Sequence, residues 1–306
     1  MTDPPLLIHI GFPKTGSTWL QEDVFRDPAS AIMLPWDNEP KSAFIHPDEF
    51  RFDPAAARAM FDGGFARARS AGRLPAISDE FLTGNPIIGL YVGRRCADRI
   101  HQVFPHGRIL IVIREQKQIV LSAYREHVFI CGWQTLPEFI GAPPLKADFM
   151  PICRLEFLEF DRLIAHYQQL FGLAQVLVLP FESLRADSAA FVKRIYDYAG
   201  APTTPDARQP ARRVGLRGGE LAARRALNSL FAHHDVSVVR GRRRRHLARR
   251  LSGIAGAVTP RTLHERIESR LKEFLDDYIG ERYAASNRRT SELIGIDLGA
   301  LGYPVG

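Results

Sequence analysis

The chain has 306 residues, of which 45% are hydrophobic, and a formal net charge of +7. This length and composition suit one large α/β domain and exclude a wholly disordered chain. The longest aliphatic run, Ile109 to Ile113, is far below the roughly 18 residues that a membrane-spanning helix needs, and no basic region followed by an apolar stretch opens the sequence. We therefore expect a cytoplasmic protein without a transmembrane segment.

The cysteines are odd in number and widely separated, at Cys96, Cys131 and Cys153. Neither a disulfide framework nor a C-x-x-C metal site is available from this spacing. A reducing compartment and a protein without a metal site are the expectations that follow.

Short aliphatic segments bounded by Gly, Pro or polar residues are typical of buried parallel strands. Such segments occur at Leu6 to Ile10, Leu74 to Ser78, Arg108 to Ile113 and Gln175 to Leu179. Helical spacing of apolar residues is found from Gly16 onward and at Ile87 to Phe104, Gln116 to Phe129, Phe157 to Phe171, Glu220 to Phe231 and Thr262 to Tyr283. Strands alternating with helices predict a single three-layer α/β domain over residues 1–306, with a central parallel sheet of about four to five strands and helices on both faces.

The most informative pattern is a predicted strand followed by a Gly-containing loop and a helix start, within Ile8 to Leu20. A helix start offers unpaired backbone N–H groups and a partial positive charge to a phosphate. Compared with the nucleotide-binding pattern G-x-x-x-x-G-K-[ST], Gly11 and Gly16 fit, but Ser17 stands where lysine is expected. The lysine lies inside the loop, at Lys14, which argues against an ordinary ATPase or GTPase.

A second pattern follows the strand from Arg108 to Ile113. Arg114 comes directly after this strand, where open α/β sheets bind ligands, and a guanidinium is well suited to a bidentate phosphate contact. Ser122 lies eight residues later, about two helical turns on, so it returns to nearly the same helix face. The pair predicts a second phosphate contact near the first.

Together the two patterns resemble those of sulfotransferases that use 3′-phosphoadenosine-5′-phosphosulfate (PAPS). Pro13 to Trp19 are similar to the family's 5′-phosphosulfate-binding signature, and Arg114 with Ser122 is similar to its 3′-phosphate site. The resemblance extends more loosely to Val178 to Leu184 and to the segment from Ile296 to Pro304. It implies a P-loop-like fold, PAPS as the co-substrate and no required metal.

One departure from the family pattern bears on the acceptor. Glu115-Gln116 stands where many members have Asn or Asp followed by Pro. This variant resembles bacterial members associated with surface carbohydrates. A small-molecule or glycan hydroxyl is therefore the expected acceptor.

The resemblance also implies a role for each residue of the loop. Sulfuryl transfer is an in-line displacement in which positioning and charge compensation supply most of the catalysis. Lys14 is expected to stabilise the departing phosphate. Trp19 is expected to stack on adenine, with core packing as the alternative. The 5′-phosphate is expected to be held by Thr15, Gly16, Ser17 and Thr18.

An acceptor hydroxyl needs a base, and a carboxylate follows the second predicted strand. Glu80 is the first candidate and Asp79 the second, because both lie at the sheet edge where the phosphate contacts should converge. The alternative for either residue is a helix N-cap or an ion pair. His127 is a rival base on the helix that carries Ser122, and His9, within a strand, is expected to be structural.

Most of the positive charge is concentrated in one segment. Arg208 to Arg250 contains 13 Arg against two acids. Three interpretations remain open: attraction of an anionic donor and acceptor, binding of nucleic acid or anionic lipid, or a solvated lid. Nucleic acid is disfavoured because neither a pattern of alternating aromatic and basic residues nor a known nucleic-acid-binding module accompanies the charge. We expect residues 201–260 to form a basic insertion or lid-like segment of the domain.

The preferred hypothesis is a PAPS-dependent sulfotransferase. A P-loop small-molecule kinase is the alternative among enzymes, although it would require Mg²⁺ and a lysine directly before the loop hydroxyl. A non-catalytic nucleotide-binding module is the alternative from another class. The acceptor, the oligomeric state and the identity of the base remain open at this stage.

Overall fold

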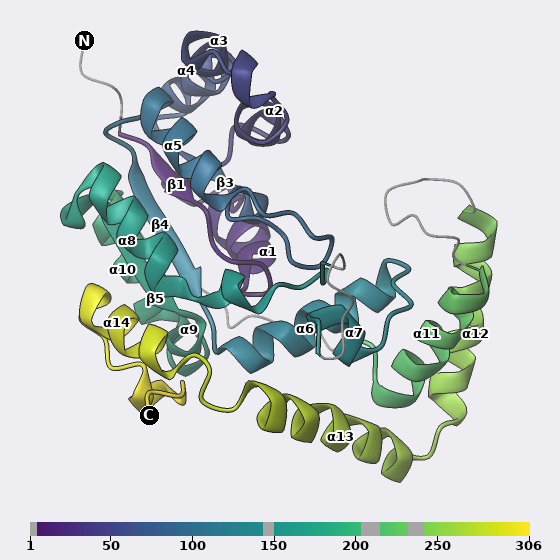
Figure 1. The fold of residues 1–306 in the computed structure, drawn as a ribbon. Coiled ribbons are helices and arrows are strands. Elements are labelled where there is room, and N and C mark those ends of the chain that lie inside the picture. Colours follow the sequence, from purple (N-terminus) through teal and green to yellow (C-terminus); the bar gives the residue numbers. More distant parts are fainter. Residues whose placement is uncertain (1–4, 143–149, 203–214, 232–241) are drawn as a thin grey trace.

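The computed structural model describes residues 5–142, 150–202, 215–231 and 242–306 (Figure 1). Its sheet is parallel throughout, with the strand order β2-β3-β1-β4-β5. The strands are β1 (Leu7–His9), β2 (Ile32–Met33), β3 (Leu74–Ser78), β4 (Arg108–Ile113) and β5 (Val176–Pro180). In the central register, Ile8 of β1 lies opposite Ile77 of β3 and Ile109 of β4.

Helices occupy most of the remaining described chain. The α-helices are α1 (Ser17–Trp19), α2 (Glu39–Phe44), α3 (Pro54–Ala59), α4 (Asp62–Ser70), α5 (Gly93–Val103), α6 (Gln116–Phe129), α7 (Leu136–Ile140), α8 (Phe160–Phe171), α9 (Phe181–Ala186), α10 (Ser188–Ala199), α11 (Gly218–Phe231), α12 (Arg242–Val258), α13 (Arg261–Ile279) and α14 (Ala284–Ile294). Short or irregular turns are η1 (Leu20–Phe25), η2 (Glu49–Arg51), η3 (Glu80–Leu82), η4 (Leu155–Leu158), η5 (Leu173–Gln175) and η6 (Gly299–Leu301).

The sheet is buried on both faces because side chains alternate along each strand. Leu7 of β1 and Leu110 of β4 belong to a core cluster shared with η1, α9 and α10. Ile8 and Ile109, their neighbours in sequence, belong to the larger cluster on the opposite face, shared with α5, α6 and α8. Three layers result, and the predicted α/β class with one parallel sheet is confirmed.

The predicted bounds of β3, β4 and α6 agree with the structure, β1 is one residue shorter at each end than predicted, and β5 is shifted by one residue. The predicted helix from Ile87 to Phe104 was wrong in its first turns, since α5 begins only at Gly93. Asn85 causes this. Its side chain accepts a hydrogen bond from the backbone N–H of Ile87 (2.9 Å), and its backbone pairs with Leu90 in a tight turn.

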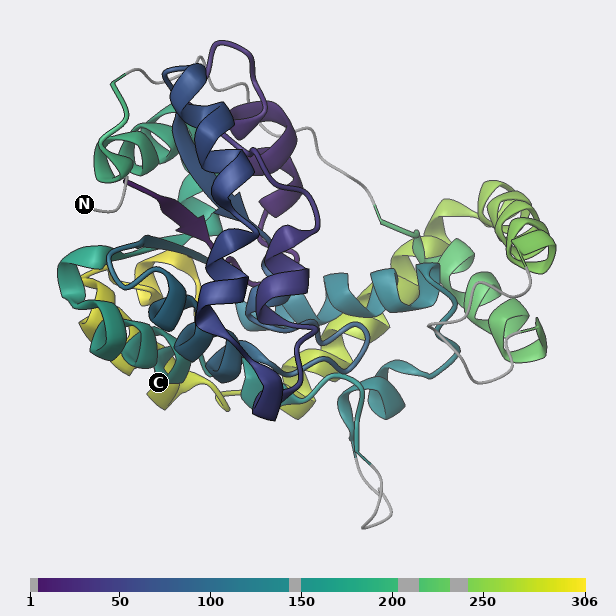
Figure 2. The same ribbon diagram turned by 90° about the horizontal axis from the view of Figure 1, so that it is seen from above.

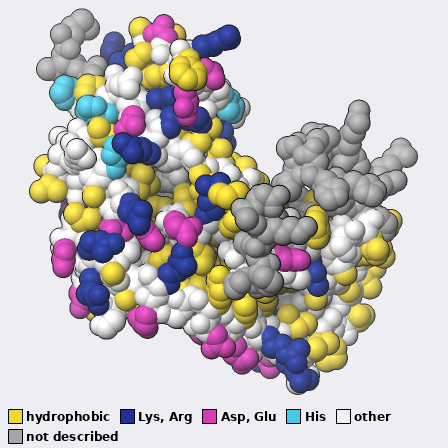
Figure 3. All heavy atoms as spheres, viewed as in Figure 1, with side chains coloured by type: hydrophobic (Ala, Val, Ile, Leu, Met, Phe, Trp, Pro, Cys, Tyr) yellow, Lys and Arg dark blue, Asp and Glu magenta, His cyan; other side chains and the backbone are white. Residues whose placement is uncertain are grey.

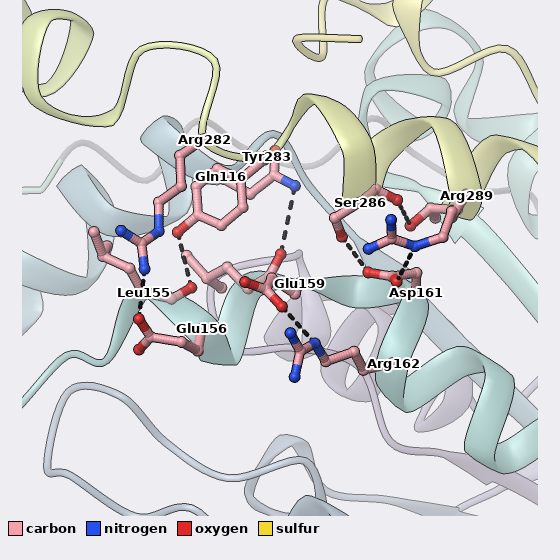
Figure 4. Close-up of polar contacts among 12 residues, drawn as sticks. Gln116, Leu155, Glu156, Glu159, Asp161, Arg162, Arg282, Tyr283, Ser286 and Arg289 are labelled. Carbon is pink, nitrogen blue, oxygen red and sulfur yellow. Dashed lines mark hydrogen bonds and ion pairs between the residues drawn. The ribbon is translucent and has the colours of Figure 1, made fainter.

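The last helix, α14, is fastened to η4 and α8 by polar contacts (Figure 4). The Tyr283 hydroxyl donates to the carbonyl of Leu155 (2.9 Å). Asp161 at the start of α8 accepts from Arg289 Nε (2.8 Å) and from the Ser286 hydroxyl. These contacts place the C-terminal part of the chain beside the edge of the sheet that carries β5 (Figure 1).

An arm of α11 and α12 stands away from the sheet and is joined to it by α13 and α6 (Figures 1 and 2). Asn228 of α11 donates to the carbonyls of Val128 and Gly132, both at 2.8 Å, and so holds the arm against the end of α6. The described part of the basic segment 201–260 is therefore mostly helical. Residues 203–214 and 232–241 of that segment lie outside the described residues.

Candidate functional site

The candidate site lies where the order in which strands are added across the sheet changes direction. After β1 the chain moves toward β2 and β3 on one side, and after β4 it moves to β5 on the other. The carboxyl ends of the neighbouring strands β1 and β4 therefore flank a topological switch point, the position at which open α/β sheets bind ligands. Lys14 follows β1, and Arg114 follows β4.

The loop after β1 needs an unusual backbone. Lys14 has φ 69° and Gly16 has φ 90°, both left-handed. A side chain at Gly16 would be strained and would place its Cβ 2.9 Å from the Phe181 ring, so only glycine fits there. A lysine in this conformation costs of order 1 kcal/mol, and such strain is typical of functional loops. The Thr15 hydroxyl donates to the carbonyl of Phe12 (2.5 Å) and closes the turn.

Arg114 joins the two predicted phosphate contacts. Its Nη1 donates to the Lys14 carbonyl (3.0 Å), and its Nη2 donates to Gln118 Oε1 (3.1 Å). The guanidinium lies over the Phe181 ring, 5.0 Å from its centroid. Burial lowers the pKa of Arg114, although a guanidinium remains charged in proteins. Its buried Nε has no hydrogen-bond partner among the described residues.

Lys14 is paired with a carboxylate that our sequence analysis did not consider. Its Nζ lies 3.6 Å from Glu126 Oε2, and both side chains remain partly exposed. Glu126 is four residues after Ser122 on α6, so the two share a helix face. This spacing was the signal that could have identified Glu126. The adjacent His127 was considered instead.

The remaining loop residues differ in their exposure. Thr15 and Ser17 are buried, and Thr18 is exposed. Trp19 is only 7% exposed and belongs to the core cluster with η1 and α10. Core packing therefore already explains this tryptophan, and its role in adenine stacking stays a prediction. Ser122 is half-buried on α6.

Of the two carboxylates after β3, the structure engages Asp79 more fully. Asp79 accepts from the backbone N–H of Phe81 (2.9 Å), pairs with Lys41 (3.4 Å) and is 5% exposed. Burial raises the pKa of Asp79, and Lys41 opposes this effect. Glu80 is half-buried and accepts from Gln21 Nε2 at 3.4 Å. Because Gln21 lies on η1, directly after the phosphate loop, this contact connects Glu80 to the site.

The two histidines considered in the sequence analysis, His9 and His127, are fully buried. His127 Nδ1 contacts the carbonyl of Ile87 (2.9 Å), and its Nε2 contacts Gln134 Oε1 (2.8 Å). With both nitrogens occupied, His127 has no free atom to accept an acceptor's proton. His9 Nδ1 bonds the Ser78 hydroxyl (2.7 Å), and burial lowers the pKa of His9 to about 4.

A half-buried acid, Glu182, supports the start of α6. Glu182 Oε1 accepts from the backbone N–H of Glu115 (3.1 Å), and the Tyr303 hydroxyl donates to Glu182 Oε2 (2.7 Å). Glu115 in turn caps α6, because its carboxylate accepts from the backbone N–H groups of Lys117 and Gln118, both at 2.9 Å. The segments around residues 182 and 303 thus meet behind Arg114.

Two features are absent from the residues that the structure describes. Within that part of the chain, no helix has the length and apolar character needed to cross a bilayer. Nor does it contain three or more His, Cys, Asp or Glu side chains grouped closely enough to bind a metal ion.

Comparison with known proteins identifies similarity in sequence and in fold. Residues 94–206, from α5 to just beyond α10, match the family model described as "Sulfotransferase family". The fold is similar to the crystal structure of a sulfotransferase from Alicyclobacillus acidocaldarius, with a TM-score of 0.54, 16% identity, and coverage of 98% of this chain and 99% of that one. No curated protein sequence matches the chain. The predicted fold is confirmed, and the family match over residues 94–206, which includes Arg114 and Ser122, supports the resemblance to sulfotransferases.

Proposed function

We propose that this chain, which its family match and fold assign to the sulfotransferases, transfers a sulfuryl group from PAPS to an acceptor hydroxyl, most simply on a carbohydrate. The observation that carries the proposal is the hydrogen bond from Arg114 to the Lys14 carbonyl (3.0 Å). It brings together two phosphate-binding patterns that lie 100 residues apart in the chain, at the switch point of the sheet.

The two ends of this arrangement suit the two phosphorylated ends of PAPS. The loop from Lys14 to Thr18 would hold the 5′-phosphosulfate by its backbone N–H groups and hydroxyls. Arg114, with its unused Nε donor, and Ser122 would hold the 3′-phosphate. The lysine's displacement from the usual kinase position disfavours a role in binding a γ-phosphate.

In the proposed reaction the acceptor oxygen attacks sulfur in line with the bridging oxygen of the 5′-phosphate. The new O–S bond forms as the bridging S–O bond breaks, and 3′-phosphoadenosine-5′-phosphate (PAP) leaves. Lys14 would stabilise the negative charge that develops on the bridging oxygen. The acceptor's proton passes to a carboxylate, for which Glu80 is our first candidate.

Glu126 is a second candidate for the base, because it is the carboxylate in contact with Lys14. A base and the leaving-group lysine must lie on either side of the transferred sulfur, so both approach the same small volume. In the protein without donor, Glu126 also neutralises the lysine. Donor binding must then break this ion pair, which makes the two carboxylates separable by experiment.

The proposed function is tested by calorimetric titration with PAP, ATP and adenosine phosphosulfate in the presence of EDTA, followed by turnover of PAPS with a panel of sugars. We expect PAP to bind without metal and far more tightly than the other two nucleotides. Tight ATP binding that requires Mg²⁺ would indicate a kinase instead. Tight PAP binding without turnover on any hydroxyl acceptor would indicate a non-catalytic module.

A further inference from the structure

The arm of α11 and α12 has no role in the proposed reaction. In this arm α12 packs its small residues against α11 and exposes its large aliphatic residues. On α12, Ala248 and Ser252 are 3% and 1% exposed. Four residues further on, a Cβ at Gly256 would lie 2.8 Å from the Cβ of Glu220 on α11. The helix therefore approaches α11 through its smallest residues, at a spacing of four that keeps them on one face.

The large aliphatic residues of α12 point the other way. The exposed fraction is 48% for Leu247, 41% for Leu251, 61% for Ile254 and 74% for Val258. Their spacing of four, three and four residues aligns them in one stripe about 17 Å long, at 1.5 Å of rise per residue. Figure 3 shows hydrophobic side chains along the outer edge of the arm. We call these four residues the α12 stripe.

Positive charge accompanies the stripe. The sequence of α12 contains six Arg and no acid. Arg250, which is exposed, lies three residues after Leu247 and four before Ile254, so it is beside the stripe. Arg249 is also exposed but faces α6 instead of the stripe, since its guanidinium lies 5.8 Å from the centroid of the Phe129 ring. An apolar stripe beside Arg250, on a helix whose sequence has six arginines and no acid, suits a partner that is apolar beneath an anionic surface.

We propose that the α12 stripe docks this protein on anionic lipid membranes, with α12 lying in the plane of the interface. Leu247, Leu251, Ile254 and Val258 would enter the boundary between headgroups and acyl chains, and the arginines would contact lipid phosphates. The inference rests on the arm alone and does not depend on sulfuryl transfer.

Shape and charge favour a membrane over a second copy of the chain. The stripe consists of exposed side chains on a helix at the edge of the arm, and a flat, fluid surface can cover such a helix along its whole length (Figures 1 and 2). Pairing two stripes would bring together two helices that each carry six Arg and no acid. Like charges at that distance oppose association, whereas an anionic bilayer attracts both helices.

The test is co-sedimentation of the full chain with vesicles of phosphatidylcholine alone and of phosphatidylcholine containing one-third phosphatidylglycerol. We expect binding to the anionic vesicles, weakened by high salt, and little binding to the neutral ones. The double substitution Leu251→Gln and Ile254→Gln should weaken binding about tenfold or more, since two apolar anchors are lost. Circular dichroism and PAP titration should stay unchanged, because both positions are exposed and outside the site.

Leu173→Gln is the matched control, since this leucine is 72% exposed on the body of the protein and away from the arm. It should bind vesicles like the wild type. Equal binding to neutral and anionic vesicles, or full binding by the double variant, would overturn the proposal. A third result would also overturn it: the wild type does not bind vesicles, and light scattering shows a dimer that the double substitution dissociates. The stripe would then be a self-association surface.

Discussion

Replacing Arg114 by alanine tests the donor assignment most directly, because this side chain has two separable functions in the structure. Its Nη1 braces the Lys14 carbonyl, which affects every nucleotide that uses the loop. Its remaining donors, including the unpartnered Nε, would serve the 3′-phosphate, which PAP has and AMP lacks. The ratio of PAP to AMP affinity therefore isolates the second function from the first.

Loss of a charge-assisted contact at a partly buried site costs roughly 1.5 to 3 kcal/mol, or about tenfold to 150-fold in affinity. We expect wild-type protein to prefer PAP over AMP by at least that factor in calorimetric titrations, and Arg114→Ala to lose most of the preference. AMP affinity should fall only modestly, through the loosened loop. A wild-type protein that binds both nucleotides equally would refute the assignment.

Arg108 provides the matched control on the same strand. It lies at the opposite end of β4, where its Nη1 donates to the carbonyl of Tyr198 (2.8 Å). Arg108→Ala removes the same side chain from the far edge of the sheet. The PAP to AMP ratio should remain that of the wild type, even if the variant unfolds at a lower temperature. An equal loss of preference in both variants would mean that stability, and not phosphate contact, sets the ratio.

Three further predictions concern the lysine, the carboxylates and a buried histidine. Lys14→Met should lower kcat by more than it weakens PAP affinity, since differential stabilisation of the leaving group acts on the rate; normal turnover at saturating PAPS would make the lysine dispensable. Glu80→Gln should lower kcat by about 10² to 10⁴ with PAP affinity retained, whereas Glu126→Gln should tighten PAP binding by freeing Lys14; the reverse pattern would assign the base to Glu126. Burial lowers the pKa of His9 from 6.5 to about 4, so between these values the unfolded chain binds the extra proton, and stability should fall by about 3 kcal/mol as pH drops through that range; urea titrations of His9→Asn should lack most of this slope.

The elements that were predicted well are those whose burial is evident from their local sequence pattern. β4 is aliphatic on both faces, and its bounds follow from that run alone. β2 has two residues and pairs with one neighbour at the sheet edge, so tertiary contact rather than local pattern defines it. The exposure of the large aliphatic residues of α12 was equally impossible to predict from the sequence, because which face of α12 is buried depends on the position of α11.

The candidate site shows the same division. Lys14 and Arg114 follow predicted strands, and parallel strands bring their carboxyl ends to one edge, so their proximity was predictable. Glu126 and His127 differ by one position, which turns a side chain by about 100° around a helix. Only the packing of α6 determines which of them faces Lys14 and which is buried beneath Gln134.

The support beneath α6 also bears on when this protein acquires its site during synthesis. Gln116 at the start of α6 bonds Asn287 Oδ1 (2.6 Å) across 171 residues, and Tyr303 bonds Glu182 across 121. Contacts of such long sequence separation form late, since a large loop must close before they are made. A nascent chain would complete its sheet on the ribosome well before α6 is anchored. The helix that carries Ser122 and Glu126 would then gain its final position only after the last helix emerges from the exit tunnel.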